Sequence, residues 1–396
     1  MKIFRILSAI AIVAVIQSCQ SDSKPGSIPK PTAVNEAPVT PRPSVYLYMV
    51  MVDNLNLREQ PNKSGRVIVR FPEGSFVEGT GVISDNKEEA TLRGIPYNEP
   101  YFQVKTSDNQ NIGWAYSAAL KPVYTGAIST RPDLNRLSKL SAFLKTLDVT
   151  KLENGGKAIE FVKTNYASSS GTLADAVFVM LENFLSTMER EGMFYRETED
   201  FTWTDSDFED IFQDRFDMNK YPLTKKYGQN GFRMEAAEGS VFPVVDWFKL
   251  GDFFVGRVTP PMKEYLEQYI AELKSYAYDD GGIVIGLDTI AQRAIFWEKF
   301  NQMNPYFVRG YETKETERWL RMVLVSGTDN TPVFDYDNNK ITDDFKKVWA
   351  IILDKYPGTK LAKTVKEFSD LCAAEGGKRT QKVEDWQNNF ANRTGE

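Results

Sequence analysis

The spacing of apolar residues changes once along the chain, near residue 125, and this change constrains the fold more than any other feature of the sequence. Between residues 45 and 125 the apolar pattern has a period of two, as in residues 45–50, 55–58 and 67–71, which is typical of β-strands. Turn residues rich in Pro, Asn and Gly separate these segments. Later apolar residues recur three and four positions apart, as in amphipathic helices. The sequence therefore predicts a small β module of residues 45–125 and a mainly α-helical domain of residues 126–396.

The helical domain is predicted to be irregular. Residues 345–372, with Tyr356, Pro357 and Gly358 at the turn, resemble one hairpin of a tetratricopeptide-like repeat. No second copy follows at a fixed 34-residue period, so the pattern does not indicate a regular array. The predicted helices cover residues 134–147, 173–191, 205–217, 243–251, 260–278, 288–302, 314–325, 342–356, 360–374 and 383–391.

The N-terminus has the three parts of a signal peptide. Two basic residues, Lys2 and Arg5, precede an uncharged apolar run over residues 6–16, which is too short to span a bilayer. Residues 16–19, which end at Cys19, resemble the lipobox of bacterial lipoproteins, although Gln17 replaces the usual small residue. The resemblance implies that residues 1–18 are removed and that Cys19 is lipidated. The alternative is an ordinary secretory signal followed by an incidental cysteine.

Residues 19–44 are predicted to form a tether. Prolines recur through this segment and large apolar residues are almost absent, so it cannot build a core. Proline-rich chain favours the polyproline II conformation, in which 25 residues extend roughly 75 Å. We therefore expect a protein held at the membrane of the cell envelope by its lipid, with the folded part either periplasmic or surface-exposed.

The β module resembles the bacterial Src-homology-3-like (SH3-like) domain of cell-envelope proteins. Residues 54–61 match its opening Leu-Asn-Leu-Arg motif, residues 71–75 its short turn, and residues 101–105 with 111–117 its closing hairpin. The chain departs from the family by having Tyr or Phe in place of the usual Trp near residue 101, and by a longer connection over residues 84–100. The resemblance implies a small closed β-barrel that binds peptidoglycan or other envelope peptides.

Four aromatic residues are candidates for the ligand contacts that this resemblance implies. They are Tyr97, Tyr101, Trp114 and Tyr116. Exposed aromatic rings in a shallow groove provide contact area at a low cost in side-chain entropy. The alternative is that Trp114 and Phe102 belong to the core of a barrel too small to leave its aromatic residues exposed.

Composition excludes several classes of function. The chain has no histidine and only two cysteines, so it can build neither a catalytic triad that uses histidine nor a His-ligated or four-cysteine zinc site. Its net charge of −6 argues against nucleic acid as a partner. Candidate calcium loops at Asp205 and Asp335 lack Gly at the sixth position and Glu at the twelfth. Nucleotide-binding glycine motifs are absent. We therefore expect neither a metal nor a cofactor.

Few residues remain that could support catalysis. Asp246 and Asp252 lie in an aromatic-rich stretch, where desolvation would favour their acid forms and make acid catalysis on a glycan conceivable. Helix capping is the ordinary alternative for such residues. The aromatic cluster of residues 296–300 and 304–307 is interpreted as helix-packing core, with a sugar-binding platform as the alternative. Cys372 is interpreted as a small buried apolar residue.

The favoured interpretation is a lipid-anchored envelope protein that is not an enzyme. Its SH3-like domain would bind peptidoglycan or envelope peptides, and its helical domain would contact other envelope proteins. The alternative is a peptidoglycan-cleaving enzyme in the helical domain that works through carboxylates alone.

Overall fold

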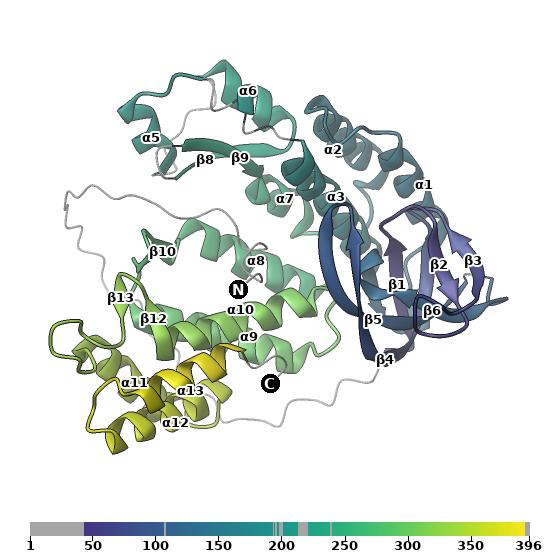
Figure 1. Ribbon diagram of the computed structural model, residues 1–396. Coiled ribbons are helices and arrows are strands. Elements are labelled where there is room, and N and C mark those ends of the chain that lie inside the picture. Colours follow the sequence, from purple (N-terminus) through teal and green to yellow (C-terminus); the bar gives the residue numbers. More distant parts are fainter. Residues whose placement is uncertain are drawn as a thin grey trace.

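The computed structural model describes residues 43–392, apart from residues 107, 193, 195, 198–200, 213–220 and 238–239. The β-sheet lies at one side of the molecule, and the C-terminal helices lie at the opposite side (Figure 1). The predicted signal peptide, Cys19 and nearly all of the tether fall outside the described residues. Within them, no helix combines the length and the apolar character needed to cross a membrane.

The N-terminal part is an open antiparallel sheet of seven strands in the order β3-β2-β6-β5-β4-β1-β7. Strands β4 and β5 are the longest, with 17 and 12 residues, and they pair with each other along most of their length. The strands are β1 (Val45–Val50), β2 (Leu55–Arg58), β3 (Val67–Phe71), β4 (Phe76–Leu92), β5 (Ile95–Thr106), β6 (Ile112–Tyr116) and β7 (Leu120–Gly126).

The predicted SH3-like barrel is therefore wrong, because the sheet does not close on itself. Strands β3 and β7 form its two edges. Residues 84–100, predicted to be a connection, instead form the outer half of the β4–β5 hairpin, with Leu92 opposite Ile95. The register of this hairpin shifts between Gly79 and Ile83 and again before Lys87, so β4 bends away from its neighbours.

Strand β1 contributes to two cores because both of its faces carry apolar or aromatic side chains. Val45, Leu47 and Met49 belong to the large core that also contains the helices. Val50 belongs to a smaller core formed within the sheet, and Tyr48 packs against that core. A barrel strand normally keeps its outer face polar. Here the helices cover one face of β1, so both of its faces are at least partly buried.

The remainder of the described chain is a mixture of helices and short hairpins. The helices begin close to residues that favour helix starts, such as Asp133, whose carboxylate accepts from the backbone N–H groups of Asn135 and Arg136. The helices are α1 (Leu134–Lys145), α2 (Glu153–Tyr166), α3 (Thr172–Glu191), α5 (Asp205–Phe212), α6 (Pro222–Gln229), α7 (Trp247–Phe254), α8 (Pro260–Lys274), α9 (Leu287–Met303), α10 (Gly310–Ser326), α11 (Asp343–Lys355), α12 (Lys360–Ala374) and α13 (Gln381–Asn392).

Three hairpins interrupt the helices, and the sequence pattern did not predict them. Strands β8 (Phe232–Ala237) and β9 (Ser240–Val245) form the longest, so the prediction of helix over residues 243–246 is wrong. Pro243 is compatible with β9 because each strand of a two-stranded hairpin has a free edge. The other two pair β10 (Tyr278–Asp279) with β11 (Gly282–Ile283), and β12 (Gly327–Thr328) with β13 (Thr331–Pro332).

A buried ion pair joins two helices, and a second, more exposed pair links them to the sheet. Arg309, at the start of α10, donates from Nη1 to Oε2 of Glu182 on α3 over 2.8 Å. Lys121 of β7 forms a further ion pair with Glu312 of α10 at 3.5 Å. The Arg309 guanidinium also lies over the ring of Trp247, 5.4 Å from its centroid. Three distant parts of the chain are therefore held together by one group of charges.

A second polar contact, between Asp175 and Thr259, holds the start of α8 and makes the stability of the protein depend on pH. The Asp175 carboxylate on α3 accepts from the backbone N–H and the hydroxyl of Thr259, at 2.8 and 2.6 Å. Burial raises the pKa of Asp175 to about 6. A carboxyl with a raised pKa holds its proton more tightly in the folded protein than in the unfolded chain. Its contribution to the free energy of unfolding is therefore complete below the unfolded pKa, near 4, and is lost as the pH rises to the folded pKa, near 6.

Asp175→Asn is therefore expected to match the native protein near pH 4 and to be more stable by about 1–3 kcal/mol at pH 7. The asparagine oxygen keeps an acceptor for Thr259 but has no charge to bury. Urea unfolding between pH 4 and pH 7 measures the difference. A difference that does not change with pH would contradict the raised pKa.

Candidate ligand-binding site

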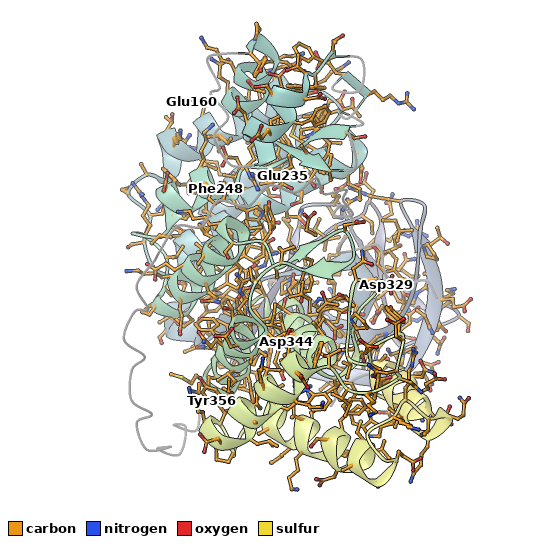
Figure 2. The ribbon with its side chains drawn as sticks, turned by 90° about the vertical axis from the view of Figure 1, so that its left-hand side faces the viewer. Glu160, Glu235, Phe248, Asp329, Asp344 and Tyr356 are labelled. Carbon is orange, nitrogen blue, oxygen red and sulfur yellow. The ribbon has the colours of Figure 1, made fainter. Side chains whose placement is uncertain are left out.

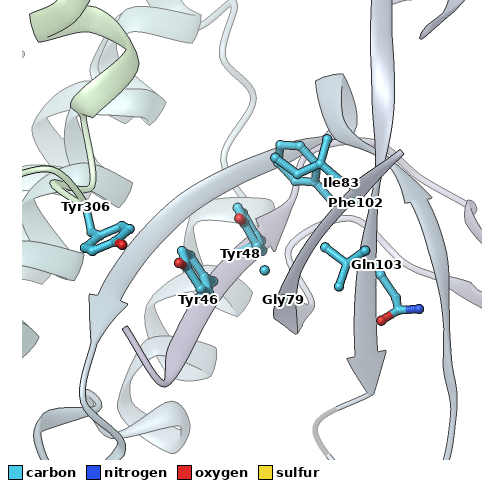
Figure 3. A pocket seen from close by; sticks show the side chains of 9 residues that line it. Tyr46, Tyr48, Gly79, Ile83, Phe102, Gln103 and Tyr306 are labelled. Carbon is cyan, nitrogen blue, oxygen red and sulfur yellow. The ribbon is translucent and has the colours of Figure 1, made fainter. Parts of the chain in front are cut away.

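The described surface is hollowed beside β1 by a cavity of about 340 Å³, which we call the aromatic groove. Figure 3 shows its rings following one another from Tyr306 past Tyr46 and Tyr48 to Phe102. The rings of Tyr48 and Phe102 are 5.6 Å apart between centroids. The groove is lined by Tyr46, Tyr48, Gly79, Gly81, Val82, Ile83, Phe102, Gln103 and Tyr306.

The alternation of β1 places two of these rings. Tyr46 and Tyr48 alternate with Val45, Leu47 and Met49, which are buried against the helices, so the two tyrosines occupy the other face of the sheet. Both rings are half-buried.

Gly79 makes room for the ring of Tyr48. In the register of the sheet Gly79 lies opposite Tyr46. A Cβ at Gly79 would lie 2.6 Å from Cε2 of Tyr48 and 3.1 Å from Cβ of Tyr46. Any larger residue at this position would displace Tyr48 and change the shape of the groove.

Tyr306 reaches the groove from the helical region. The hydroxyl of Thr125, next to the end of β7, donates to the backbone carbonyl of Tyr306, and Thr125 pairs with Tyr46 in the sheet. Three residues after Tyr306, Arg309 is anchored by its ion pair with Glu182. Tyr306 was predicted to belong to the helix-packing core, and its place in the groove corrects that prediction. The contact between Thr125 and Tyr306 spans 181 residues of sequence, which is why a pattern read along the chain could not place Tyr306 beside β1.

The groove provides polar groups but carries no formal charge on its lining residues. Burial, and to a lesser degree the neighbouring Tyr46, raises the pKa of Tyr48 to about 12, so its hydroxyl is neutral at physiological pH and can donate and accept. The amide of Gln103 lies nearby, and its Oε1 accepts from the Thr80 hydroxyl at 2.9 Å. Such a lining favours uncharged ligand groups that offer an apolar face together with hydrogen-bonding atoms.

Two of the predicted contact residues are buried inside the sheet. Tyr101 and Tyr116 are 3% and 6% exposed, and their rings meet edge to face at 5.4 Å. The Tyr101 hydroxyl donates to Oε2 of Glu88 at 2.8 Å, and the Tyr116 hydroxyl donates to the Glu88 backbone carbonyl at 2.6 Å. These two tyrosines therefore brace the β4–β5 hairpin and present almost no surface to a ligand.

The other two predicted residues are half-buried and do not line the groove. Trp114 lies opposite Arg58 and Gln103 in the sheet, and Tyr97 lies opposite Ala90. Both rings pack against the small core of the sheet. The groove instead uses Phe102 and Gln103, which adjoin the predicted Tyr101, together with two tyrosines of β1. The sequence does indicate the two tyrosines of β1, because both faces of this first strand carry apolar or aromatic residues.

The two carboxylates considered for catalysis have separate roles. Asp246 is buried and is the N-cap of α7, where it accepts from the backbone N–H of Lys249 at 3.1 Å. The Lys249 ammonium lies 3.3 Å from its other oxygen. Asp252 is exposed on the same helix. The capping alternative therefore describes Asp246, and the structure does not pair it with Asp252.

The candidate calcium loop at Asp335 and the free cysteine Cys372 both have structural roles. The Asp335 carboxylate closes a turn by accepting from the backbone N–H groups of Asp337 and Asn338, both at 3.0 Å. No group of His, Cys, Asp and Glu suited to a metal ion is present in the part of the chain that the structure describes. Cys372 is fully buried, as predicted, and burial raises its thiol pKa to about 12, which suppresses its reactivity.

Comparison with known proteins found no family model, no curated protein and no solved structure that matches this chain.

Proposed function

We propose that this protein is a binding protein of the cell envelope, anchored by lipid at Cys19, and that the aromatic groove binds the peptide part of peptidoglycan or a similar extended envelope peptide. The observation that supports the proposal most directly is the row of rings formed by Tyr46, Tyr48, Phe102 and Tyr306. The lipobox and the proline-rich segment support the anchoring at the membrane.

The chemistry of the groove favours a peptide that is uncharged where it is bound. Its volume of about 340 Å³ lies at the lower end of the range for ligand pockets, about 300–1,000 Å³, so it accommodates a few residues of an extended chain. Tyrosine rings pack on small apolar side chains, and their hydroxyls reach peptide amides. The Gln103 amide provides both a donor and an acceptor.

The proposal is for binding without a reaction. The nine lining residues of the groove include neither a carboxylate nor an ammonium group. Asp246, the candidate acid, has its carboxylate engaged by the backbone and side chain of Lys249. No observation in the described residues favours the carboxylate-dependent enzyme.

Tyr48→Ala is expected to weaken retention on purified peptidoglycan about tenfold, because truncating a central aromatic residue of a binding site costs more than about 1 kcal/mol. The assay incubates the mature chain, residues 19–396 with Cys19→Ser to avoid detergent, with insoluble peptidoglycan. It then measures both the bound protein and the fragments released into the supernatant.

Tyr336→Ala is the matched control, because Tyr336 is 73% exposed and lies outside the groove. Its retention should equal that of the unmodified chain, and no fragments should be released. Equal retention of the Tyr48 and Tyr336 variants would show that the groove is not the binding site. Released fragments would contradict binding without a reaction.

A further inference from the structure

A second cavity, of about 220 Å³, lies within the helical region and has a different chemistry. It is bounded by α2, α3 and α7, and by the end of α6 with the turn that follows it. Six of its twelve lining residues are aliphatic or aromatic, and the others are charged residues, glycines and Gln229. The apolar ones are Ile159, Val162, Leu181, Leu250, Phe253 and Phe254.

The charged lining residues of this cavity carry a net positive charge. Lys163 and Lys249 are basic and Asp246 is acidic, which gives a formal charge of +1. The Lys249 ammonium is engaged by Asp246 at 3.3 Å and by the carbonyl of Gly228 at 2.9 Å, so these three groups largely satisfy one another. Lys163 is exposed on α2, and no ion pair to it is seen within the described residues. Its charge is therefore available to a ligand.

We propose that this cavity binds an amphiphile with one negatively charged headgroup and a short aliphatic tail, such as a carboxylic acid of about eight carbons. The tail would pack against the apolar walls, and the headgroup would pair with Lys163. This site is separate from the aromatic groove and does not depend on its function.

The volume sets the length of the tail. An apolar cavity of about 150 Å³ is large enough for benzene. At roughly 30 Å³ for each water-sized group, a cavity of 220 Å³ holds about seven such groups. Seven carbons beyond the carboxylate correspond to octanoate. A longer tail would extend into solvent and gain little.

Calorimetric titration of the same detergent-free chain with butanoate, hexanoate, octanoate and decanoate tests the proposal. Each methylene buried within the cavity is expected to improve affinity about fourfold, which follows from about 0.8 kcal/mol per CH₂. Affinity should therefore rise about fifteenfold from hexanoate to octanoate and then level off. An absence of binding, or a rise that continues equally to decanoate, would overturn the proposal, since the latter indicates adsorption on a surface.

Variants identify the site and the headgroup contact. Lys163→Gln is expected to weaken octanoate binding about two- to fivefold and to leave octan-1-ol binding unchanged. Ile159→Trp fills the cavity and should weaken both ligands at least tenfold. The control is Lys157→Gln on the same helix, where Lys157 donates to Asn154 and does not line the cavity. The outer surface of α2 is marked by Glu160 in Figure 2.

The chain-length series on the unmodified chain keeps the test decisive even where Ile159→Trp fails to fold. Equal octanoate affinity in the Lys163 and Lys157 variants would overturn the headgroup assignment. Unchanged octanoate binding in a folded Ile159→Trp protein would overturn the cavity itself.

Discussion

Replacing Arg309 with Met is expected to destabilise the protein by about 3–5 kcal/mol, because it leaves the Glu182 carboxylate buried without a counter-charge. The side chains of Arg309 and Glu182 are only 9% and 7% exposed. Burial by itself would raise the pKa of Glu182, but the charge of Arg309 and then that of Lys121 bring it below its usual range. Without Arg309, the acid must either remain charged in an apolar setting or take up a proton.

The pair has few ways to relax because its neighbours are fixed. Ser186 donates to Oε1 of Glu182 at 2.9 Å, and the Arg309 guanidinium lies 5.5 Å from the ring centroid of Tyr265. Arg309 also follows Tyr306 by three residues. We therefore expect Arg309→Met to weaken ligand retention by the aromatic groove as well as stability.

Urea unfolding of the detergent-free chain measures the change in stability. The double variant Glu182→Met and Arg309→Met should recover a large part of the loss, since replacing a whole buried ion pair by apolar residues is often neutral. The control is Lys366→Met, which breaks an exposed pair with Asp370 and should cost less than about 1 kcal/mol. A loss for Arg309→Met no larger than this control would contradict the argument.

Trp297→Ala is expected to lower the free energy of unfolding by about 3–5 kcal/mol, because it leaves a cavity at the centre of the helical core. Trp297 is 1% exposed and meets the rings of Phe296, Phe300 and Tyr265 at 5.1, 5.7 and 5.9 Å between centroids. Its Nε1 donates to Oε1 of Glu272 at 2.8 Å. The substitution therefore removes a large ring and also a hydrogen bond to a partly buried acid.

Trp297→Phe separates these two effects. It retains most of the ring volume but loses the donor to Glu272, so a smaller loss of about 1–3 kcal/mol is expected. Both variants are compared by urea unfolding, with Tyr336→Ala as an exposed aromatic control. Similar stability of the Ala and Phe variants would mean that the ring contributes little packing energy, contrary to its burial.

Local patterns along the chain predicted much of the secondary structure. The helices around residues 134–147, 173–191 and 360–374 follow from apolar residues recurring every three or four positions, because that spacing places them on one face. The aromatic run over residues 296–300 was correctly interpreted as core, whereas Tyr306 of the same predicted cluster lines the aromatic groove. Helix α2 was missed because Gly155 and Gly156 disfavour helix in isolation. There Gly155 allows close packing, since a Cβ would lie 2.2 Å from the Asn230 carbonyl oxygen.

Hairpin β8–β9 shows how tertiary packing overrides a local signal. Residues 241–245 form a short apolar run that contains Pro243, and such a run is equally compatible with the start of a helix. In the structure Val241 and Val245 are buried in the large core, while Arg233 of β8 pairs with Glu235 and lies over the ring of Phe248. Glu235 and Phe248 are labelled in Figure 2.

Local patterns are enough to predict strands in residues 45–125 and mainly helices after them, because strand and helix periods are properties of neighbouring residues. The residue types alone also exclude the catalytic chemistries that need histidine. Local patterns do not show that the sheet stays open or that Tyr306 joins Tyr46 and Tyr48 in one groove, which became visible only in the three-dimensional fold. The position of Tyr306 depends on contacts such as Thr125 with Tyr306 and Glu182 with Arg309, whose partners lie more than 100 residues apart and leave no periodic pattern in the sequence.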